Sequence, residues 1–226
     1  KTWVMGNIKF DFNLPADIDV QGINFRSKKF GNRPVWIAAS THEGEELEIL
    51  KAHRRILKTI RNMLLIIVPR HPERFAKVEQ LLKTEKWRYT TRSSSQSVAD
   101  ICEVFLLDSI GELLLFYSVS DIAFVGGSLI PIGGHNLLEP ASLSLPILTG
   151  IYMFNQQEMT DLLVEASAVR IVKDKAEIVN NVLSFHNDKE ASKNSGAKAR
   201  MIVEKNKGAL TSLMRRLDHI LAERIN

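Results

Sequence analysis

Short apolar runs alternate with longer segments of helical periodicity along most of this chain. The runs that predict buried strands are residues 35–39, 64–68, 104–107 and 122–125, with shorter ones at 87–91, 146–149 and 168–172. Helical periodicity marks residues 43–60, 73–84 and 110–119, and shorter helices are expected at 137–143 and 157–166. Repeated strand–helix–strand units of this length predict a parallel sheet with helices on both faces. Because the crossovers of such units are right-handed, we expect a Rossmann-like α/β fold.

Size and polarity place residues 1–226 in a single domain. With 226 residues, 45% of them hydrophobic, the chain can bury one sizeable core. Residues 11–33 are polar and predict a loop or a short helix, and residues 173–226 form charged helices with a polar interruption at 184–195. The last predicted helix, 208–225, carries an apolar stripe that we expect to face the core. The stripe consists of Leu210, Leu213, Leu217, Ile220 and Leu221.

The composition argues against several classes of protein. No apolar run reaches the ~18 residues needed to cross a bilayer. Cys102 is the only cysteine, so a disulfide framework is excluded and we expect a small buried hydrophobe there. The six histidines do not fall at metal-ligand spacings, so we expect no metal site. The chain begins with Lys1 and a strand-like segment at 2–5, which suggests a fragment of a longer protein.

The charge of the chain is mildly basic. A net charge of +4, with an isoelectric point near 9.2, suits an anionic ligand or an anionic membrane surface. We expect no nucleic acid as a partner, because this excess is small and no aromatic residues are interleaved with the basic ones. The densest basic cluster is Arg54, Arg55, Lys58 and Arg61, which we interpret as the solvated face of a helix.

The strongest signal for a ligand site lies between residues 121 and 140. The predicted strand 122–125 runs into Gly-Gly-Ser at 126–128, and a second glycine pair at 133–134 precedes His135 and Asn136. In a parallel sheet, ligands bind between the end of a strand and the start of the next helix. Glycines allow the backbone to approach an anion closely, and free N–H groups at a helix start favour negative charge. The block therefore predicts a site for a phosphate-bearing ligand.

A structural interpretation of the same block remains open. It is neither a Walker A loop nor the Gly-x-Gly-x-x-Gly fingerprint of dinucleotide-binding proteins. Its glycines can form only a tight turn, with Asn136 and Glu139 as a capping box at the helix start. For Glu139 the two interpretations are compatible, because an acid in the first turn of a helix can face either the backbone or a ligand.

Two further segments follow predicted strands and offer groups that bind anions. Residues 40–46 supply hydroxyls and helix-start amides, although Ser40 and Glu43 can instead form a capping box. Arg70 follows the strand 64–68 and lies between two prolines, which restrict its conformation. Its fork of donors matches phosphate or carboxylate, and a surface salt bridge is the alternative.

The segment 108–112 and the beginning of the chain give weaker signals. Gly111, in the first turn of a predicted helix, weakens that helix relative to alanine. Close approach of a flat ligand such as a base would explain the glycine, and a capping box of Ser109 with Glu112 is the alternative. Lys9 lies in an alternating, strand-like run at 6–11 and could point into a cleft, although single lysines are usually solvated.

Taken in order, these segments resemble those of one enzyme family. They are Gly6-Asn7-x-Lys9-Phe10-Asp11, Ser40-Thr41-His42-x-Gly44-Glu45, Pro69-Arg70-His71-Pro72-Glu73-Arg74-Phe75, Asp108-x-x-Gly111-Glu112-Leu113 and Gly126-Gly127-Ser128 through Glu139-Pro140. Over about residues 1–172 the chain is similar to the carboxyl-terminal half of the 3-deoxy-D-manno-octulosonic acid (Kdo) transferases, bacterial enzymes that add Kdo to lipid A precursor. The resemblance implies the two-domain GT-B glycosyltransferase architecture. It places the catalytic base and the acceptor site in the amino-terminal domain, and the donor CMP-Kdo in the carboxyl-terminal domain.

The resemblance also implies roles for individual residues. Arg70 would contact the phosphate, Glu139 would accept hydrogen bonds from ribose hydroxyls, and Lys9 would be catalytic by stabilising charge as CMP departs. The implied donor-binding residues are Pro69, Arg70, Ile110, Gly111, Glu112, Asn136, Leu137, Leu138 and Glu139, with Ser40, Thr41, Gly127, Ser128 and His135 as additional contacts. Neither a metal nor another cofactor is implied.

The chain departs from the family pattern at residues 150–156. Gly150-Ile151-Tyr152 and Asn155-Gln156 stand where the family often has Gly-Pro-His and, slightly later, Asn-Phe. By resemblance, the amino-terminal acceptor domain lies outside this sequence. The full-length protein would act at the cytoplasmic face of the bacterial inner membrane, with lipid A precursor and the membrane surface as partners. This fragment would be soluble and would bind CMP without turnover. The alternatives are a GT-B transferase or epimerase that uses a UDP-sugar, and a non-catalytic nucleotide-binding module.

Overall fold

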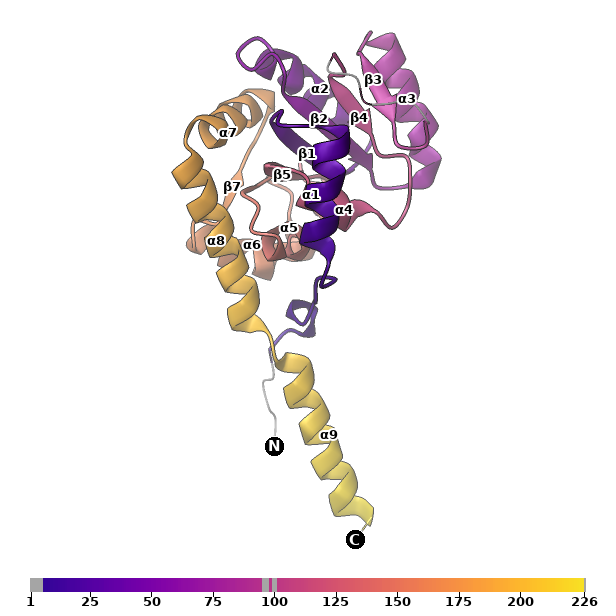
Figure 1. Cartoon of the computed structure of the whole chain (residues 1–226). Coiled ribbons are helices and arrows are strands. Elements are labelled where there is room, and N and C mark those ends of the chain that lie inside the picture. The colour runs from indigo at the N-terminus through magenta and orange to yellow at the C-terminus, as the bar shows by residue number, and fades with distance from the viewer. Residues whose placement is uncertain (1–5, 95–97, 99–100, 226) are drawn as a thin grey trace.

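The computed structural model describes residues 6–94, 98 and 101–225, and a seven-stranded sheet lies at the centre of this part of the chain (Figure 1). The strands are β1 (Val35–Thr41), β2 (Leu64–Pro69), β3 (Tyr89–Thr91), β4 (Val104–Leu106), β5 (Ile122–Val125), β6 (Ile147–Thr149) and β7 (Val169–Ile171). All neighbours are parallel, in the order β3-β4-β2-β1-β5-β6-β7. The predicted fold class is confirmed. The seven apolar runs between residues 35 and 172 that predicted strands all form strands, with ends that differ by up to two residues, and the strand-like segment at 2–5 lies outside the described residues.

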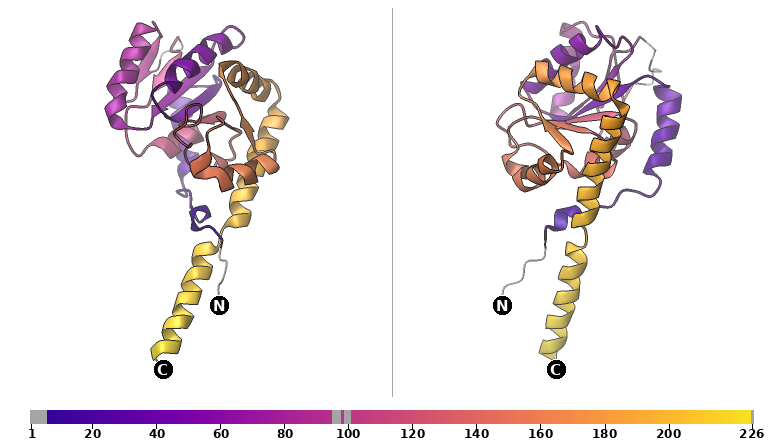
Figure 2. Two further views of the ribbon diagram at one scale, coloured as in Figure 1. Left: turned by 180° about the vertical axis from the view of Figure 1, so that it is seen from behind. Right: turned by 90° about the vertical axis from the view of Figure 1, so that its left-hand side faces the viewer.

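Helices cover both faces of this sheet (Figure 2). The helical elements are η1 (Ile8–Phe10), α1 (Ile18–Lys29), α2 (Glu45–Ile56), η2 (Pro72–Arg74), α3 (Phe75–Thr84), α4 (Leu113–Ser118), α5 (Leu138–Ser142), η3 (Phe154–Gln156), α6 (Gln157–Glu165), α7 (Lys175–Asn187), α8 (Lys189–Asn206) and α9 (Ala209–Ile225). Alternate residues of β1 serve the two faces. Trp36 packs in the core shared with α2, α3 and α7, whereas Ile37 packs in the core shared with α1 and α4. A third core lies among β5, β6, α5, α6 and α8.

The segment 11–33, predicted as a loop or a short helix, contains the three-turn helix α1. The helical alternative is therefore the one found. Periodicity could not decide between the two, because this helix is mostly solvent-exposed and its sequence lacks an apolar stripe; only Ile18 and Gly22 are buried. A side chain at Gly22 would collide with Ser118 of α4. The glycine therefore permits close packing of two helices.

The polar stretch 184–195 was predicted to interrupt the charged helices, but all of it except Asp188 is helical. Helix α7 continues to Asn187, and α8 begins at Lys189. The break is confined to Asp188, whose carboxylate accepts a hydrogen bond from the Ala191 N–H at 2.9 Å. The polar residues there are a helix cap and a solvent-exposed helical surface.

Helix α9 projects away from the sheet, beyond the end of α8 (Figure 1). Its apolar stripe does not face the core as predicted: Leu210, Leu217 and Ile220 are 39–47% exposed, and the side chain of Leu221 lies outside the described part of the chain. The start of α9 is tied to the beginning of the chain, because Asp11 accepts hydrogen bonds from the N–H groups of Gly208 and Leu210. These bonds lower the pKa of Asp11. Among the described helices, none combines the length and apolarity that a bilayer crossing requires.

Candidate nucleotide-binding site

Four loops meet at the carboxyl edge of the sheet, where β1, β2, β4 and β5 end. The strand order reverses at the centre, because the chain builds β2, β3 and β4 on one side of β1 and then returns to place β5 on the other. The crevice beside such a reversal is the usual ligand position in open parallel sheets. The fold therefore gathers at one edge the segments 40–46, 69–75, 108–112 and 126–139, which lie far apart in the sequence.

A hollow of about 170 Å³ lies between the loops that follow β2 and β4. It is lined by Ser40, Val68, Pro69, Arg70, Pro72, Phe75, Ser109, Ile110, Gly111 and Leu113. Five residues of the predicted donor site thus share one cavity: Ser40, Pro69, Arg70, Ile110 and Gly111. A larger hollow of about 500 Å³ lies beside the starts of β3 and β4, where Arg54 covers the ring of Trp87 at 4.5 Å. None of the predicted site residues lines it.

Arg70 lies at this carboxyl edge, and its side chain makes no polar contact with the other described residues. Its backbone N–H donates to the Thr41 carbonyl at 3.0 Å, which anchors the loop to the end of β1. The side chain is exposed and has no hydrogen bond or ion pair with any other described residue. Arg74, one helical turn further on, differs: it pairs with Glu43 at 2.8 Å and with Glu46 at 3.0 Å. The alternative role of Arg70, a surface salt bridge, is therefore absent from the described part of the chain.

The loop after β4 presents Gly111 to the hollow and keeps Glu112 out of it. Helix α4 begins only at Leu113, so the predicted helix start at Ile110 is wrong. Gly111 has a φ of +84°, and an added Cβ would meet nothing within 4 Å, so the glycine lies beside open space. The carboxylate of Glu112 accepts hydrogen bonds from the Arg92 side chain at 2.7–3.1 Å and from the Ser109 hydroxyl. Burial raises the pKa of Glu112, but these bonds outweigh it and the pKa is lowered. Glu112 thus braces the loop.

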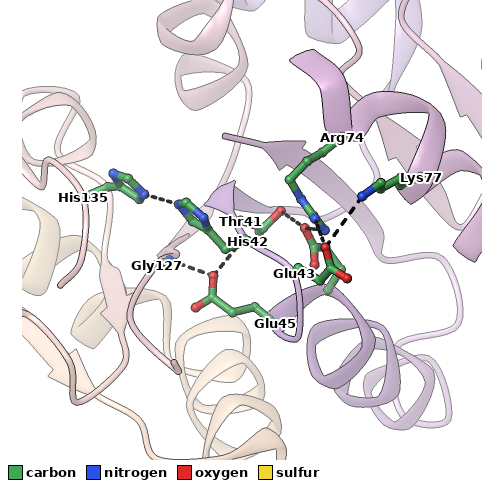
Figure 3. A network of polar contacts seen from close by, with 9 residues as sticks. Thr41, His42, Glu43, Glu45, Arg74, Lys77, Gly127 and His135 are labelled. Carbon is green, nitrogen blue, oxygen red and sulfur yellow. Dashed lines mark hydrogen bonds and ion pairs between the residues drawn. The ribbon is translucent and has the colours of Figure 1, made fainter. Parts of the chain in front are cut away.

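The backbone amides of the glycine-rich loop after β5 bind an anion of the same chain, the carboxylate of Glu45. The buried Glu45 carboxylate accepts a hydrogen bond from the backbone N–H of Gly127 at 2.7 Å (Figure 3). It also accepts from the backbone N–H groups of Ser128 and Leu129, both at 2.9 Å. A further hydrogen bond comes from His42 at 3.0 Å. The prediction that this loop receives the ligand's anion was wrong for these amides, because a carboxylate of the same chain already occupies them.

The start of α2 also differs from the predicted capping box. Gly44, with a φ of +96°, precedes the helix, and Glu43 is 78% exposed and pairs with Arg74 instead of capping. Thr41 was expected as a donor contact, but it is fully buried and its hydroxyl donates to Glu46 at 3.2 Å. Burial raises the pKa of Glu46, and the ion pair with Arg74 opposes this. The Thr41–Glu46–Arg74 cluster, which sequence reasoning missed, fixes the loop after β1 against η2 (Figure 3).

The block 136–139 contributes two polar side chains, those of Asn136 and Glu139, and two apolar ones in the core. Asn136 accepts a hydrogen bond from the Leu138 N–H at 3.0 Å, as a cap does, and it also bonds to Glu139. The side chains of Leu137 and Leu138 are at most 3% exposed, so only their backbone could face a ligand. Helix α5 has five residues, too few for a strong helix dipole at its start. Burial raises the pKa of half-buried Glu139, while Asn136 and the nearby Arg70 lower it.

Hydrogen bonds from the segment 150–156 hold the glycine-rich loop in place. The N–H of Tyr152 donates to the Ser128 carbonyl at 2.9 Å, and the N–H of Asn155 donates to the Gly133 carbonyl at 2.9 Å. The Ser128 hydroxyl accepts from the Gly150 N–H at 2.8 Å and is fully buried. This part of the chain therefore positions the loop, and none of its residues lines the hollow.

Three histidines that are dispersed in the sequence meet at the carboxyl edge. The Nε2 atoms of His42 and His135 lie 2.7 Å apart, and the ring of His71 meets that of His42 edge-on. Burial lowers the pKa of His135 to about 4, and the charges of His42, Arg70 and His71 add to this effect. Among the described residues, no cluster of three or more His, Cys, Asp or Glu side chains could hold a metal ion.

Lys9 lies apart from the hollow. It belongs to the short helix η1, so the strand-like run predicted there is wrong, and it is exposed. It borders a separate hollow of about 240 Å³ with Asn7, Phe154, Asn155, Gln156, Gln157, Glu158 and Met159. Phe10 of the same turn is buried in the third core, so this motif anchors the beginning of the chain.

Comparisons with known proteins agree with this geometry. No protein-family model matches the chain. Over 212 residues the chain is 42% identical to the 3-deoxy-D-manno-octulosonic acid transferase of Haemophilus influenzae, a match that covers 93% of this chain and 50% of that protein. The crystal structure of the C-terminal CMP-Kdo binding domain of WaaA from Acinetobacter baumannii superposes with a TM-score of 0.80 and 37% identity, covering 84% of this chain and 99% of that domain. The structure of Anabaena Alr3699/HepE with UDP and glucose, at 14% identity and a TM-score of 0.63, shares the fold, with 96% of this chain and 54% of that one covered.

The parallel sheet, the reversal at β1 and β5 and the hollow beside it define the class: this is the carboxyl-terminal domain of a GT-B glycosyltransferase. Within that class, the chain belongs to the Kdo transferase family. It spans half the length of the Haemophilus influenzae relative and nearly all of the Acinetobacter baumannii domain.

Proposed function

We propose that this domain binds CMP-Kdo, and that the full-length protein transfers Kdo from it to a lipid A precursor in lipopolysaccharide core biosynthesis. The observation that carries the proposal is the hollow at the carboxyl edge, where the guanidinium of Arg70, which pairs with no other described side chain, stands beside Pro69, Ile110 and Gly111. The description of the Acinetobacter baumannii domain as CMP-Kdo binding supports the same ligand.

Each side of the hollow suits one part of CMP. The Arg70 fork can donate two hydrogen bonds to the phosphate. Ile110, 77% exposed, offers an apolar surface to the cytosine ring, and the missing side chain of Gly111 lets the base approach the backbone. Glu139 does not line the hollow, but its carboxylate is close enough to Arg70 to feel its charge, and it would accept hydrogen bonds from the ribose hydroxyls.

The reaction is a displacement at the anomeric carbon of Kdo that uses no metal. A base outside this chain takes a proton from the acceptor hydroxyl, whose oxygen bonds to the anomeric carbon as the bond to the CMP phosphate breaks. Arg70 stabilises the charge on the departing phosphate. Lys9 lies outside the hollow, so its contribution requires that the domains close. The reaction would take place at the cytoplasmic face of the inner membrane, where the acceptor lipid and the membrane surface are partners.

Calorimetric titration of this domain with CMP, UMP and cytidine tests the proposal. We expect CMP to bind most tightly, cytidine to bind more weakly because it lacks the phosphate, and UMP to be discriminated against. No heat and no thermal shift at millimolar CMP would contradict the proposal. Tighter binding of UMP would favour an enzyme that uses a UDP-sugar.

A second experiment addresses turnover. The full-length protein should transfer Kdo from CMP-Kdo to a lipid A precursor. This chain, which spans half the length of its Haemophilus influenzae relative, should not do so alone if the acceptor site belongs to the other half, as we propose. A folded full-length protein that binds CMP but transfers no Kdo would indicate a non-catalytic nucleotide-binding module.

A further inference from the structure

The contact between His42 and His135 has the geometry of a hydrogen bond between two imidazole rings. Their Nε2 atoms are 2.7 Å apart, the ring planes differ by 5° and the ring centroids are 5.0 Å apart. The centroid separation equals the N–N distance plus about two ring radii, so the rings meet edge to edge in a common plane and do not stack. One Nε2 therefore carries a proton and the other accepts it.

The pair is held in this position from both sides. One oxygen of the Glu45 carboxylate accepts the backbone N–H of His42 and that of Gly127, which sets the spacing of the two loops. Gly127 has a φ of +65°, and an added Cβ would lie 2.8 Å from the His135 ring. Any side chain at this glycine would push the ring away from its partner.

The surroundings of the pair are rich in positive charge. The groups that act on it are Arg70 and His71 after β2, Arg74 of η2 and Glu45 of α2, with Glu139 of α5 acting on Arg70. Burial comes first in lowering the pKa of both rings, and for His42 the charge of Glu45 opposes the shift. At neutral pH both rings are thus uncharged, although they lie beside the guanidinium of Arg70. An anion bound beside the two rings would raise their pKa values and favour a protonated pair.

We propose that His42 and His135 form the second half of the phosphate-binding site, and that the pair takes up one proton from solvent when the phosphate of CMP binds. The inference rests on the proposed function. After proton uptake, one Nε2–H still bridges the two rings and both Nδ1 atoms carry a proton. The pair then bears one positive charge. His135 supplies the contact to the phosphate, and His42 is the positioning residue that shares the proton.

The experiment measures proton uptake directly in this domain. CMP and cytidine are titrated near pH 7.5, where a phosphomonoester with a pKa of about 6 is already ionised, in buffers of low and high ionisation enthalpy. We expect CMP to take up a fraction of a proton approaching one, and cytidine to take up none. In ¹⁵N-histidine spectra, the pair starts with two unprotonated nitrogens, and the signal of the Nδ1 that gains the proton should disappear as CMP saturates, whereas that of the accepting Nε2 remains.

Variants separate proton sharing from packing. His42→Gln places an amide group near the position of the histidine Nε2 atom, and an amide cannot take up a proton. This variant should bind CMP about tenfold more weakly and without proton uptake. His186→Gln, on α7 and away from this edge, should behave as the unchanged protein. CMP binding to the unchanged protein without proton uptake and without a change in the histidine nitrogen signals would refute this inference and leave the proposed function standing. Absence of CMP binding would overturn both.

Discussion

Glu45 makes a strong prediction, because its carboxylate replaces a ligand inside the glycine-rich loop. Each of its oxygens accepts two backbone N–H groups: Ser128 and Leu129 on one, His42 and Gly127 on the other, at 2.7–3.0 Å. In Glu45→Gln the amide oxygen can serve one of these pairs, and the NH₂ group must face the other. Two buried donors then lose their acceptors, at about 1–3 kcal/mol each.

We therefore expect Glu45→Gln to lower the free energy of unfolding by about 2–6 kcal/mol, measured by urea denaturation followed by circular dichroism. Glu43→Gln is the matched control, because Glu43 is 78% exposed and its loss should change stability by less than about 0.5 kcal/mol. Amide exchange of Gly127–Leu129 should accelerate in Glu45→Gln and remain unchanged in the control. Stability within about 0.5 kcal/mol of the unchanged protein would refute the account of this loop.

Three further predictions concern other parts of the domain. Gly111→Ala and Gly31→Ala should each cost about 1–2 kcal/mol of stability, because both glycines have positive φ beside open space, but only Gly111→Ala should weaken CMP binding in calorimetry. Burial lowers the pKa of His53 from 6.5 to about 3, so stability should fall by about 1.4 kcal/mol per pH unit below pH 6.5, a slope that His53→Gln should lack in denaturation at several pH values. Arg74→Ala should destabilise by about 3–5 kcal/mol near neutral pH, because buried Glu46 loses its partner, and by less in acid. Equal CMP affinity in both glycine variants would contradict the role of Gly111 in the hollow. A pH dependence of stability that is unchanged in His53→Gln would contradict the argument from His53. An effect of Arg74→Ala that does not depend on pH would contradict the argument from Glu46.

The sequence predicted the sheet well because its central strands are buried on both faces. The central strands β2, β4 and β5 are uninterrupted, fully buried apolar runs, a signal that does not depend on tertiary contacts, whereas the edge strands β3 and β7 contain polar residues and are only partly buried. Helix α1 was predicted only as one of two alternatives for the opposite reason: its close contact with α4 is made by a glycine, which periodicity does not reveal. The stripe on α9 was assigned to the core because an apolar stripe does not specify the surface that covers it.

The candidate site was predicted in part. Proline and glycine punctuation at strand ends identified Arg70 and Gly111, which the fold then placed in one hollow. The same reasoning failed for Gly127 and Ser128, because a glycine-rich loop binds an anion from a ligand or from its own chain with the same amides. Glu45 could have been suspected only as a carboxylate at the start of the adjacent helix α2. The meeting of His42 and His135 depends on the strand order, which brings β1 beside β5.

Arg70 offers the most direct test of the hollow as a nucleotide site. Calorimetry would compare CMP with cytidine on the unchanged protein, on Arg70→Ala and on Arg61→Ala, which removes an exposed arginine elsewhere. We predict that Arg70→Ala weakens CMP binding by roughly 1.5–3 kcal/mol, leaves cytidine binding unchanged and does not shift the melting temperature. CMP affinity equal to that of the unchanged protein, or an equal loss for cytidine, would show that Arg70 does not bind the phosphate.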